Sequence, residues 1–193
     1  MKSSAIMGLL VVMACASSGG SGSSSNGLGS VGGGDQDANI KRVSIAGVDL
    51  QADGRSTSPV VWHDVPGSVS HTWQSLPVAF HKLGLTITRY DSTAYIIEGE
   101  RLRSRADFGG KQLTSLLDCG DVAGMPNATR FDVNIQVRTA LRGSATASSV
   151  ASAVVASAKP SDVSGVLMPC VVNSSAADRV AVAITEAAIA GNK

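Results

Sequence analysis

The sequence has little of what usually indicates a function. Charged residues make up 16% of the 193 positions and aromatic residues 4%, and the formal net charge is only +1. A chain this close to neutrality has no long-range field that would draw it to nucleic acid or to an anionic membrane surface. The apolar run at residues 5–13 is far shorter than the roughly 20 residues that a membrane-spanning helix requires. We therefore expect no nucleic-acid partner and no permanent membrane span.

Residue patterns of catalytic and metal sites are also missing. The histidines are His63, His71 and His81, and their spacing matches no metal-binding motif. An enzyme would need His63 and Asp64, or a comparable pair, to converge in a cleft, and nothing in the sequence indicates this. We expect neither enzymatic activity nor a bound cofactor or metal.

The N-terminus has the architecture of an export signal. Lys2 supplies a positive charge, and residues 5–13 form a short apolar core that ends just before Cys15. Residues 12–15, Val-Met-Ala-Cys, look like the lipobox of bacterial lipoproteins, although that family prefers leucine at the first position and a smaller residue at the second. The resemblance implies that residues 1–14 are removed and that lipid on Cys15 anchors the chain to a membrane.

The residue after the anchor bears on the destination. Lipoproteins that stay at the inner membrane of double-membrane bacteria often carry an aspartate at this position, whereas this chain has Ala16. By that resemblance, the outer membrane, on its periplasmic side, is the expected location. The alternative is an ordinary secretory signal cut near Ala14 or Ala16, which would leave a soluble periplasmic protein.

The other two cysteines are expected to form a disulfide. Lipidation of Cys15 would leave Cys119 and Cys170 as an even pair in an oxidising compartment. They lack the Cys-x-x-Cys spacing of redox sites, and no cluster of further ligands completes a zinc site. A bridge between them would stabilise the fold by roughly 4 kcal/mol.

The chain divides into a tether and one domain. Residues 16–38 are mostly Ser, Gly and Asn, which bury too little apolar surface to offset the entropy of ordering. We expect Cys15 and this stretch, residues 15–38, to act as a disordered tether that reaches roughly 25–30 Å. Residues 39–193 are then expected to form a single domain.

Alternating apolar and polar residues predict the strands of this domain. The clearest pattern runs over residues 131–138, and a hairpin is expected over residues 85–98 with its turn at Asp91 and Ser92. Further strands are expected over residues 42–50 with a bend at Gly47, over residues 145–158, where a helix is the less favoured alternative, and over residues 166–172.

Three segments have helical spacing. The first carries the stripe Trp73, Leu76, Phe80 and Leu83, with a cap at Ser68 or Ser70 and Gly84 at its end. Pro77 predicts a kink or a later start of this helix. A short helix is expected over residues 111–118, and a C-terminal helix follows a capping-box pattern at Ser175 and Asp178. The order of elements predicts an α+β domain, a two-layer sandwich of an antiparallel sheet with helices packed on one face.

One stretch carries a family resemblance. Residues 72–74 (Thr-Trp-Gln), residues 79–87 (Ala-Phe-His-Lys-Leu-Gly-Leu-Thr-Ile), Asp91 and residues 94–96 (Ala-Tyr-Ile) resemble the repeated domain of the BamC (NlpB) family of outer-membrane lipoproteins. The resemblance implies a helix-grip fold and a non-enzymatic role as an accessory of the machinery that inserts β-barrels into the outer membrane. This chain differs in having one candidate domain instead of two, a Gly/Ser tether and an added cysteine pair.

A basic stripe is the one local charge feature. Arg101, Arg103 and Arg105 alternate with other residues, so on a strand they would line one face and could bind phosphate or carboxylate groups. The favoured interpretation is a charged strand edge that discourages aggregation.

The expected role is binding. We expect a lipid-anchored cell-envelope lipoprotein that binds an envelope protein or assists assembly. The alternative is a periplasm-facing module for a small ligand or lipid, which would need a cavity lined by residues such as Phe80, Tyr95 and Phe131.

Overall fold

The computed structural model describes the backbone of residues 42–45, 48–51, 60–160 and 167–191, and the side chains from residue 60 onward within these ranges. These described residues belong to one compact unit. The expected signal peptide, the expected lipidation site at Cys15 and the expected tether all lie outside the described residues. No described helix is long and apolar enough to cross a bilayer.

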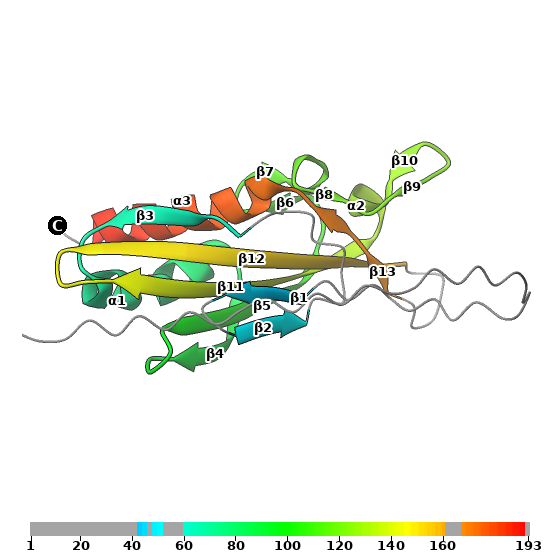
Figure 1. Ribbon diagram of the computed structural model, residues 1–193. Coiled ribbons are helices and arrows are strands. Elements are labelled where there is room, and N and C mark those ends of the chain that lie inside the picture. Colours follow the sequence, from blue (N-terminus) through cyan, green and yellow to red (C-terminus); the bar gives the residue numbers. More distant parts are fainter. Residues whose placement is uncertain (1–41, 46–47, 52–59, 161–166, 192–193) are drawn as a thin grey trace, which may run out of the picture. The chain divides into compact units, whose positions relative to one another are not determined.

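Six strands form one antiparallel sheet (Figure 1). From one side to the other its strands are β13, β12, β11, β5 and β4. β3 pairs with the same edge of β12 as β13 does, but at the opposite end of that strand. The bounds are β3 Trp62–Pro66, β4 Thr86–Asp91, β5 Ile96–Ser104, β11 Asp132–Gly143, β12 Ala147–Lys159 and β13 Met168–Pro169. The strands expected over residues 131–138 and 145–158 and the hairpin over residues 85–98 are thus confirmed.

Eight short strands form two-stranded pairs outside this sheet. The single strand predicted over residues 42–50 was wrong, because β1 and β2 form an antiparallel hairpin around residues 46–47. The bounds are β1 Arg42–Ile45, β2 Val48–Gln51, β6 Asp107–Phe108, β7 Lys111–Gln112, β8 Leu117–Asp118, β9 Asp121–Val122, β10 Met125–Pro126 and β14 Val171–Val172.

The first long helix, α1 (Val69–Lys82), begins and ends as predicted. Ser68 is its N-cap and accepts a hydrogen bond from the His71 N–H, and Gly84 follows the helix at a φ of 72°. Pro77 lies inside α1, so the later start was wrong. Because Pro77 has no N–H, the carbonyl of Trp73 receives no helical donor from it, and the Tyr90 hydroxyl lies 3.5 Å from that oxygen.

Of the two remaining predicted helices, the C-terminal one is present and the one over residues 111–118 is not. The segment expected to be helical over residues 111–118 instead contains β7, the 3-10 turn η1 (Leu113–Ser115) and β8. Leu113, Leu116 and Leu117 are buried as predicted, but they belong to a turn and a short strand and not to a helix. The C-terminal helix α3 (Ser174–Ala190) is capped by Asn173 and not by Ser175. A four-residue helix, α2 (Asn127–Arg130), precedes β11.

The disulfide links the segment that follows β8 to the residue between β13 and β14. Cys119 follows β8 and Cys170 lies between β13 and β14, and their sulfur atoms are bonded. The strand expected over residues 166–172 is divided at Cys170, because β13 pairs with β12 whereas β14 pairs with β8. The predicted pairing of these two cysteines is confirmed.

One main core cluster combines sheet and helices. It contains alternate residues of β11, namely Val133, Ile135 and Val137, together with apolar residues of β12, α1 and α3. The coarse prediction, an antiparallel sheet with a few helices in an α+β domain, is confirmed.

The opposite set of alternate residues forms what we call the second face. The strand register aligns these residues in four rows across β4, β5, β11, β12 and β3. The polar row is Thr86, Glu100, Gln136 and Val155; the charged row is Arg89, Glu98, Arg138 and Ala153; the apolar row is Asp91, Ile96, Ala140, Ala151 and Trp62; and the end row is Arg142, Ser149 and Asp64.

Candidate binding face

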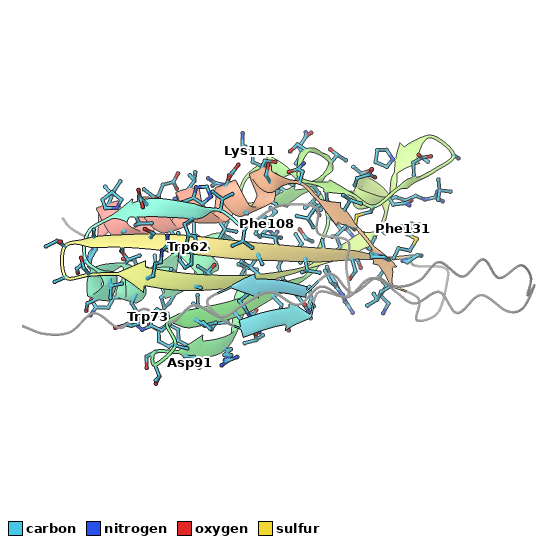
Figure 2. All side chains as sticks on the ribbon, in the orientation of Figure 1. Trp62, Trp73, Asp91, Phe108, Lys111 and Phe131 are labelled. Atoms are coloured by element: carbon cyan, nitrogen blue, oxygen red, sulfur yellow. A yellow bond between two sulfur atoms is a disulfide. The ribbon has the colours of Figure 1, made fainter. Side chains whose placement is uncertain are left out.

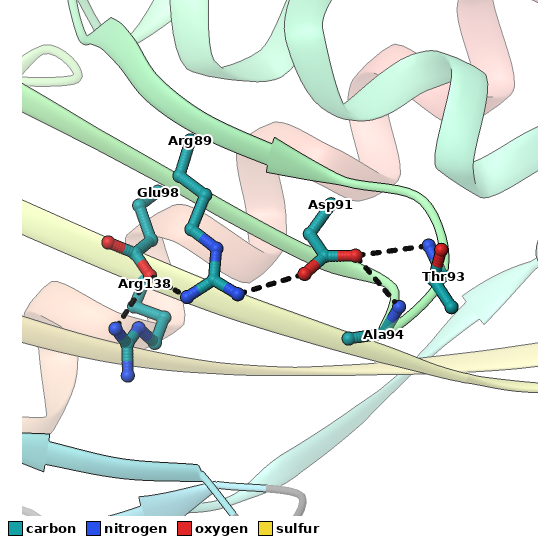
Figure 3. A network of polar contacts seen from close by, with 6 residues as sticks. All are labelled: Arg89, Asp91, Thr93, Ala94, Glu98 and Arg138. Carbon is teal, nitrogen blue, oxygen red and sulfur yellow. Dashed lines mark hydrogen bonds and ion pairs between the residues drawn. The ribbon is translucent and has the colours of Figure 1, made fainter.

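The charged row is a chain of alternating charges across three strands (Figure 3). Nη2 of Arg138 lies 2.6 Å from Oε1 of Glu98, and Nη1 of Arg89 lies 3.4 Å from the same oxygen. Nη2 of Arg89 in turn donates to Oδ2 of Asp91 at 2.8 Å. The two guanidinium groups therefore share one carboxylate, which fixes the positions of all four side chains.

Arg138 is the most enclosed member of this network. Its side chain is 15% exposed, and that of Glu98 is 24% exposed. The Nε and Nη1 atoms of Arg138 are buried and have no hydrogen-bond partner among the described residues. Because a buried N–H without an acceptor is costly, these two atoms call for an acceptor that lies outside the described residues.

Asp91 ties the network to the turn between β4 and β5. Its Oδ1 accepts hydrogen bonds from the backbone N–H groups of Ala94 and Thr93, at 3.0 and 3.1 Å. The Ala94 N–H contributes most to lowering the pKa of Asp91, followed by the hydrogen bond from Arg89. The hydrogen bond to Asp91 likewise raises the pKa of Arg89. Both groups are thus held in their charged forms.

The apolar row lies beside the charged row. Ile96 and Ala140 are each 1% exposed and Ala151 is fully buried, and these three form a second core cluster, apart from the main one. Trp62 and Val60 pack against this cluster from β3 and from the segment that enters it. The second face is therefore partly apolar, and Trp62 and Val60 cover part of its apolar row.

Trp62 is also held by a cation–π contact. The guanidinium carbon of Arg142 lies 3.9 Å from the centroid of the Trp62 ring. Arg142 belongs to the end row, where Ser149 donates a hydrogen bond of 2.8 Å to Asp64. Tryptophan and arginine side chains are both enriched at protein–protein interfaces.

Two hollows open on this face. One, of about 220 Å³, lies between the polar and charged rows and is lined by residues that include Thr88, Glu98, Arg138 and Val155. The other, of about 520 Å³, lies beside the end row, where Asp64 and Arg142 contribute to its wall. Both are lined by a mixture of polar and apolar groups.

The three aromatic residues considered for ligand binding lie apart from one another and outside the two hollows described above. Phe80 is fully buried in the main core, Phe131 is 7% exposed at the start of β11, and Tyr95 lies in the β4–β5 turn, edge-on to Trp73. Figure 2 shows Phe131 beside the disulfide, far along the sheet from Trp62. None of the three aromatic residues lines either hollow.

The histidines are placed separately. His63 in β3 lies 3.4 Å from Asp178 in α3, not beside a cleft with Asp64, and Nε2 of His71 lies 2.8 Å from the carbonyl oxygen of Ala188. His81 is exposed near the end of α1. Within residues 60–160 and 167–191, no group of three or more His, Cys, Asp or Glu side chains could hold a metal ion.

The structure disperses the basic stripe. Arg101 forms an ion pair with Asp107 at 3.6 Å, and Arg105, beyond the end of β5, pairs with Asp132. Arg103 has a φ of 59°, and the register of β5 against β11 shifts near it, so the two-residue alternation breaks there. Anion binding by these arginines stays a prediction.

The second face itself was missed in the sequence. The alternation along residues 131–138 predicts a strand, and nothing in it assigns a role to the polar side chains. Arg138 and Glu98 are 40 positions apart, and their pairing depends on the register of two strands. The available signal was the coincidence of Arg89, Glu98 and Arg138 at alternate positions of three predicted strands.

Comparison with known proteins gave no match, either to a family model or to a curated protein.

Proposed function

We propose that this chain is a lipid-anchored cell-envelope lipoprotein that acts by binding, with the second face as the surface that meets a protein partner. The observation that carries the proposal is the juxtaposition of the charged and apolar rows. Arg138 has two buried donors that find no acceptor in the part of the chain that the structure describes, and Trp62 lies one row away. Directional donors beside an aromatic anchor give a surface both specificity and affinity.

The proposed location of the chain is supported by its N-terminal sequence and by the disulfide. Residues 12–15 resemble a lipobox, which makes Cys15 the anchor. A disulfide between Cys119 and Cys170 is in keeping with an exported protein, because thiols of cytosolic proteins are kept reduced. We place the domain at the outer membrane, facing the periplasm.

The fold supports an accessory role of the kind that the BamC resemblance implies. α1 contacts β4, β11 and β12, and α3 contacts β3, β12 and α1. Both helices share the main core cluster with the same alternate residues of the sheet. We interpret this as a helix-grip arrangement with the helices on one face, which would leave the second face for a partner.

The anchor is tested by the intact mass of the mature protein. The precursor is expressed in a bacterial host, and Cys15→Ser is compared with Ser17→Ala, a control in the tether. We expect an acylated N-terminus at Cys15 in the wild type and in the control, and none in Cys15→Ser. An unacylated wild-type product that begins elsewhere would contradict the lipid anchor.

The binding face is tested with a photo-crosslinking amino acid placed in the full chain. Val155 lies on the polar row and lines the smaller hollow, whereas Val78 is 62% exposed on α1 and serves as the matched control. We expect light-dependent adducts with another envelope protein from position 155 and not from position 78. Equal adducts from both positions would contradict a role for the second face.

A further inference from the structure

We infer that the β1–β2 hairpin of this chain is an intramolecular occupant of the second face, docking over the apolar row and regulating access to it. The inference deepens the proposed function, on which its regulatory part rests. The apolar row is buried more deeply than the described residues around it can explain.

Ile96 is the residue that shows this mismatch. It is 1% exposed, yet along the apolar row three strand spacings separate it from Trp62. At about 4.8 Å per spacing this is roughly 14 Å, which is farther than an indole ring extends. Trp62 therefore does not account for the burial of Ile96, which points to cover from a segment outside the sheet.

The chain just before β3 leads toward that cover. Val60 lies two residues before the first residue of β3 and packs against the cluster of Ile96, Ala140 and Ala151. Eight residues separate Val60 from Gln51, the last residue of β2. They span at most about 30 Å, so the hairpin is tethered close enough to reach the second face.

The hairpin has the pattern of a half-buried element. Its register pairs Val43 with Leu50 and Ile45 with Val48, so the four apolar positions share one face of the hairpin. The opposite face carries the pairs Arg42 with Gln51 and Ser44 with Asp49. An isolated two-stranded hairpin is at best marginally stable in water, and it needs a surface on which to bury its apolar face.

The covalent linker favours the hairpin over a separate molecule as the occupant of the second face. A short linker gives the hairpin an effective concentration in the millimolar range at the second face, so a weak apolar contact suffices to keep it there. A partner must either displace the hairpin or bind on top of it. The hairpin is then a competitor built into the chain, which sets the threshold for partner binding.

The test uses the full mature chain with the photo-crosslinker at position 155, and a second probe at Ala153, which lines the smaller hollow and packs against the cluster of Ile96, Ala140 and Ala151. Peptide mapping after illumination identifies the linked residues. We expect an intramolecular link to the segment 42–51. A link to a second copy, a link to another region, or the absence of any link from both positions would overturn the inference.

Two hairpin variants give the control. Val43→Asp combined with Ile45→Asp places charge on the apolar face, whereas Ser44→Asp places charge on the opposite face of the same strand. We expect the link to fall at least tenfold in the first variant and to persist in the second. Equal loss or equal retention in both would contradict docking through the apolar face. Circular dichroism checks that each variant remains folded.

The same variants separate this inference from the proposed function. If the hairpin regulates access, adducts between position 155 and an envelope protein increase in the Val43→Asp/Ile45→Asp chain. A hairpin link without partner adducts in any variant would refute the second face as a partner site but retain the docking. Partner adducts in the wild type without a hairpin link would refute the docking but retain the second face as a partner site.

Discussion

Phe80 of α1 lies so close to the backbone of Gly99 in β5 that a Cβ atom at this glycine would come within 2.8 Å of Cδ1 of the ring. The same Cβ would lie 3.1 Å from the carbonyl oxygen of Thr86 on the neighbouring strand. The ring is fully buried, so it has little room to retreat. The helix thus packs onto the sheet at a point where only glycine fits.

Gly99→Ala should therefore destabilise the domain through overpacking, by about 1–3 kcal/mol in the free energy of unfolding. Urea denaturation followed by fluorescence measures this. Gly110→Ala is the control, because a Cβ there meets nothing within 4 Å and has only the strain of a φ of 78°. A smaller loss for Gly99→Ala than for Gly110→Ala would contradict the packing argument.

Removal of the disulfide should lower the free energy of unfolding by more than Gly99→Ala does. Cys119 and Cys170 are 51 positions apart, and loop closure in the unfolded chain predicts a loss of roughly 4 kcal/mol for Cys119→Ala/Cys170→Ala. Unfolding of the wild type with reductant should match that of the double variant without it. An unchanged urea midpoint after verified reduction would show that the bridge does not stabilise the fold.

The charged row should respond asymmetrically to substitution. Glu98→Ala leaves the enclosed Arg138 without its carboxylate, which we expect to cost about 1–3 kcal/mol. Replacing both partners, as Glu98→Leu/Arg138→Met, removes the need for pairing and should cost less than the single change. Urea denaturation of the two variants tests this. A double variant that is less stable than Glu98→Ala would mean that the ion pair is itself strongly stabilising.

Asp91 should contribute to stability only where it is ionised. Its pKa is lowered in the folded state from an ordinary value of 3.8, so its contribution is fully present above that value and is lost as the pH falls through the lower folded pKa. The stability difference between the wild type and Asp91→Asn should therefore be constant near neutral pH and shrink below about pH 4. Ser92→Ala, in the same turn, is the control.

Thermal unfolding of the three proteins between pH 2 and pH 7 measures this dependence. Asp132 and Glu186 also have lowered pKa values, caused first by their hydrogen bonds from Arg105 and Lys82, so the wild type alone loses stability in acid for several reasons. The quantity to follow is the difference from Asp91→Asn. A difference that is independent of pH down to pH 2 would contradict a role for the ionised carboxylate.

Much of the fold was predictable because it depends on local pattern. The alternation over residues 131–138 and the stripe of Trp73, Leu76 and Phe80 each reflect one element burying one side. The helix predicted over residues 111–118 failed because three leucines at helical spacing are equally buried by a turn and a short strand. Helical spacing over so short a stretch does not exclude that arrangement.

The candidate site was much less predictable than the fold. The charged row depends on the register between β4, β5 and β11, and a shift of one residue would move Glu98 to the other face. The β1–β2 hairpin escaped prediction for a related reason. Gly47 is equally compatible with a bend in one strand and with a turn between two, and pairing partners decide between them.

The long pairing of β11 with β12 also determines the order in which the domain can fold. The two strands are joined by residues 144–146 and run in continuous register from Gly143 opposite Ser148 to Asp132 opposite Lys159. Closing this loop costs little chain entropy, whereas β3 must find β12 across more than 80 intervening residues. The β11–β12 ribbon is therefore the template on which β3 is added late, and pulse-labelled hydrogen exchange should protect Val137 before Trp62. A newly made chain would thus carry an incomplete second face until β3 is added, although the ribosome made β3 before either strand of the ribbon.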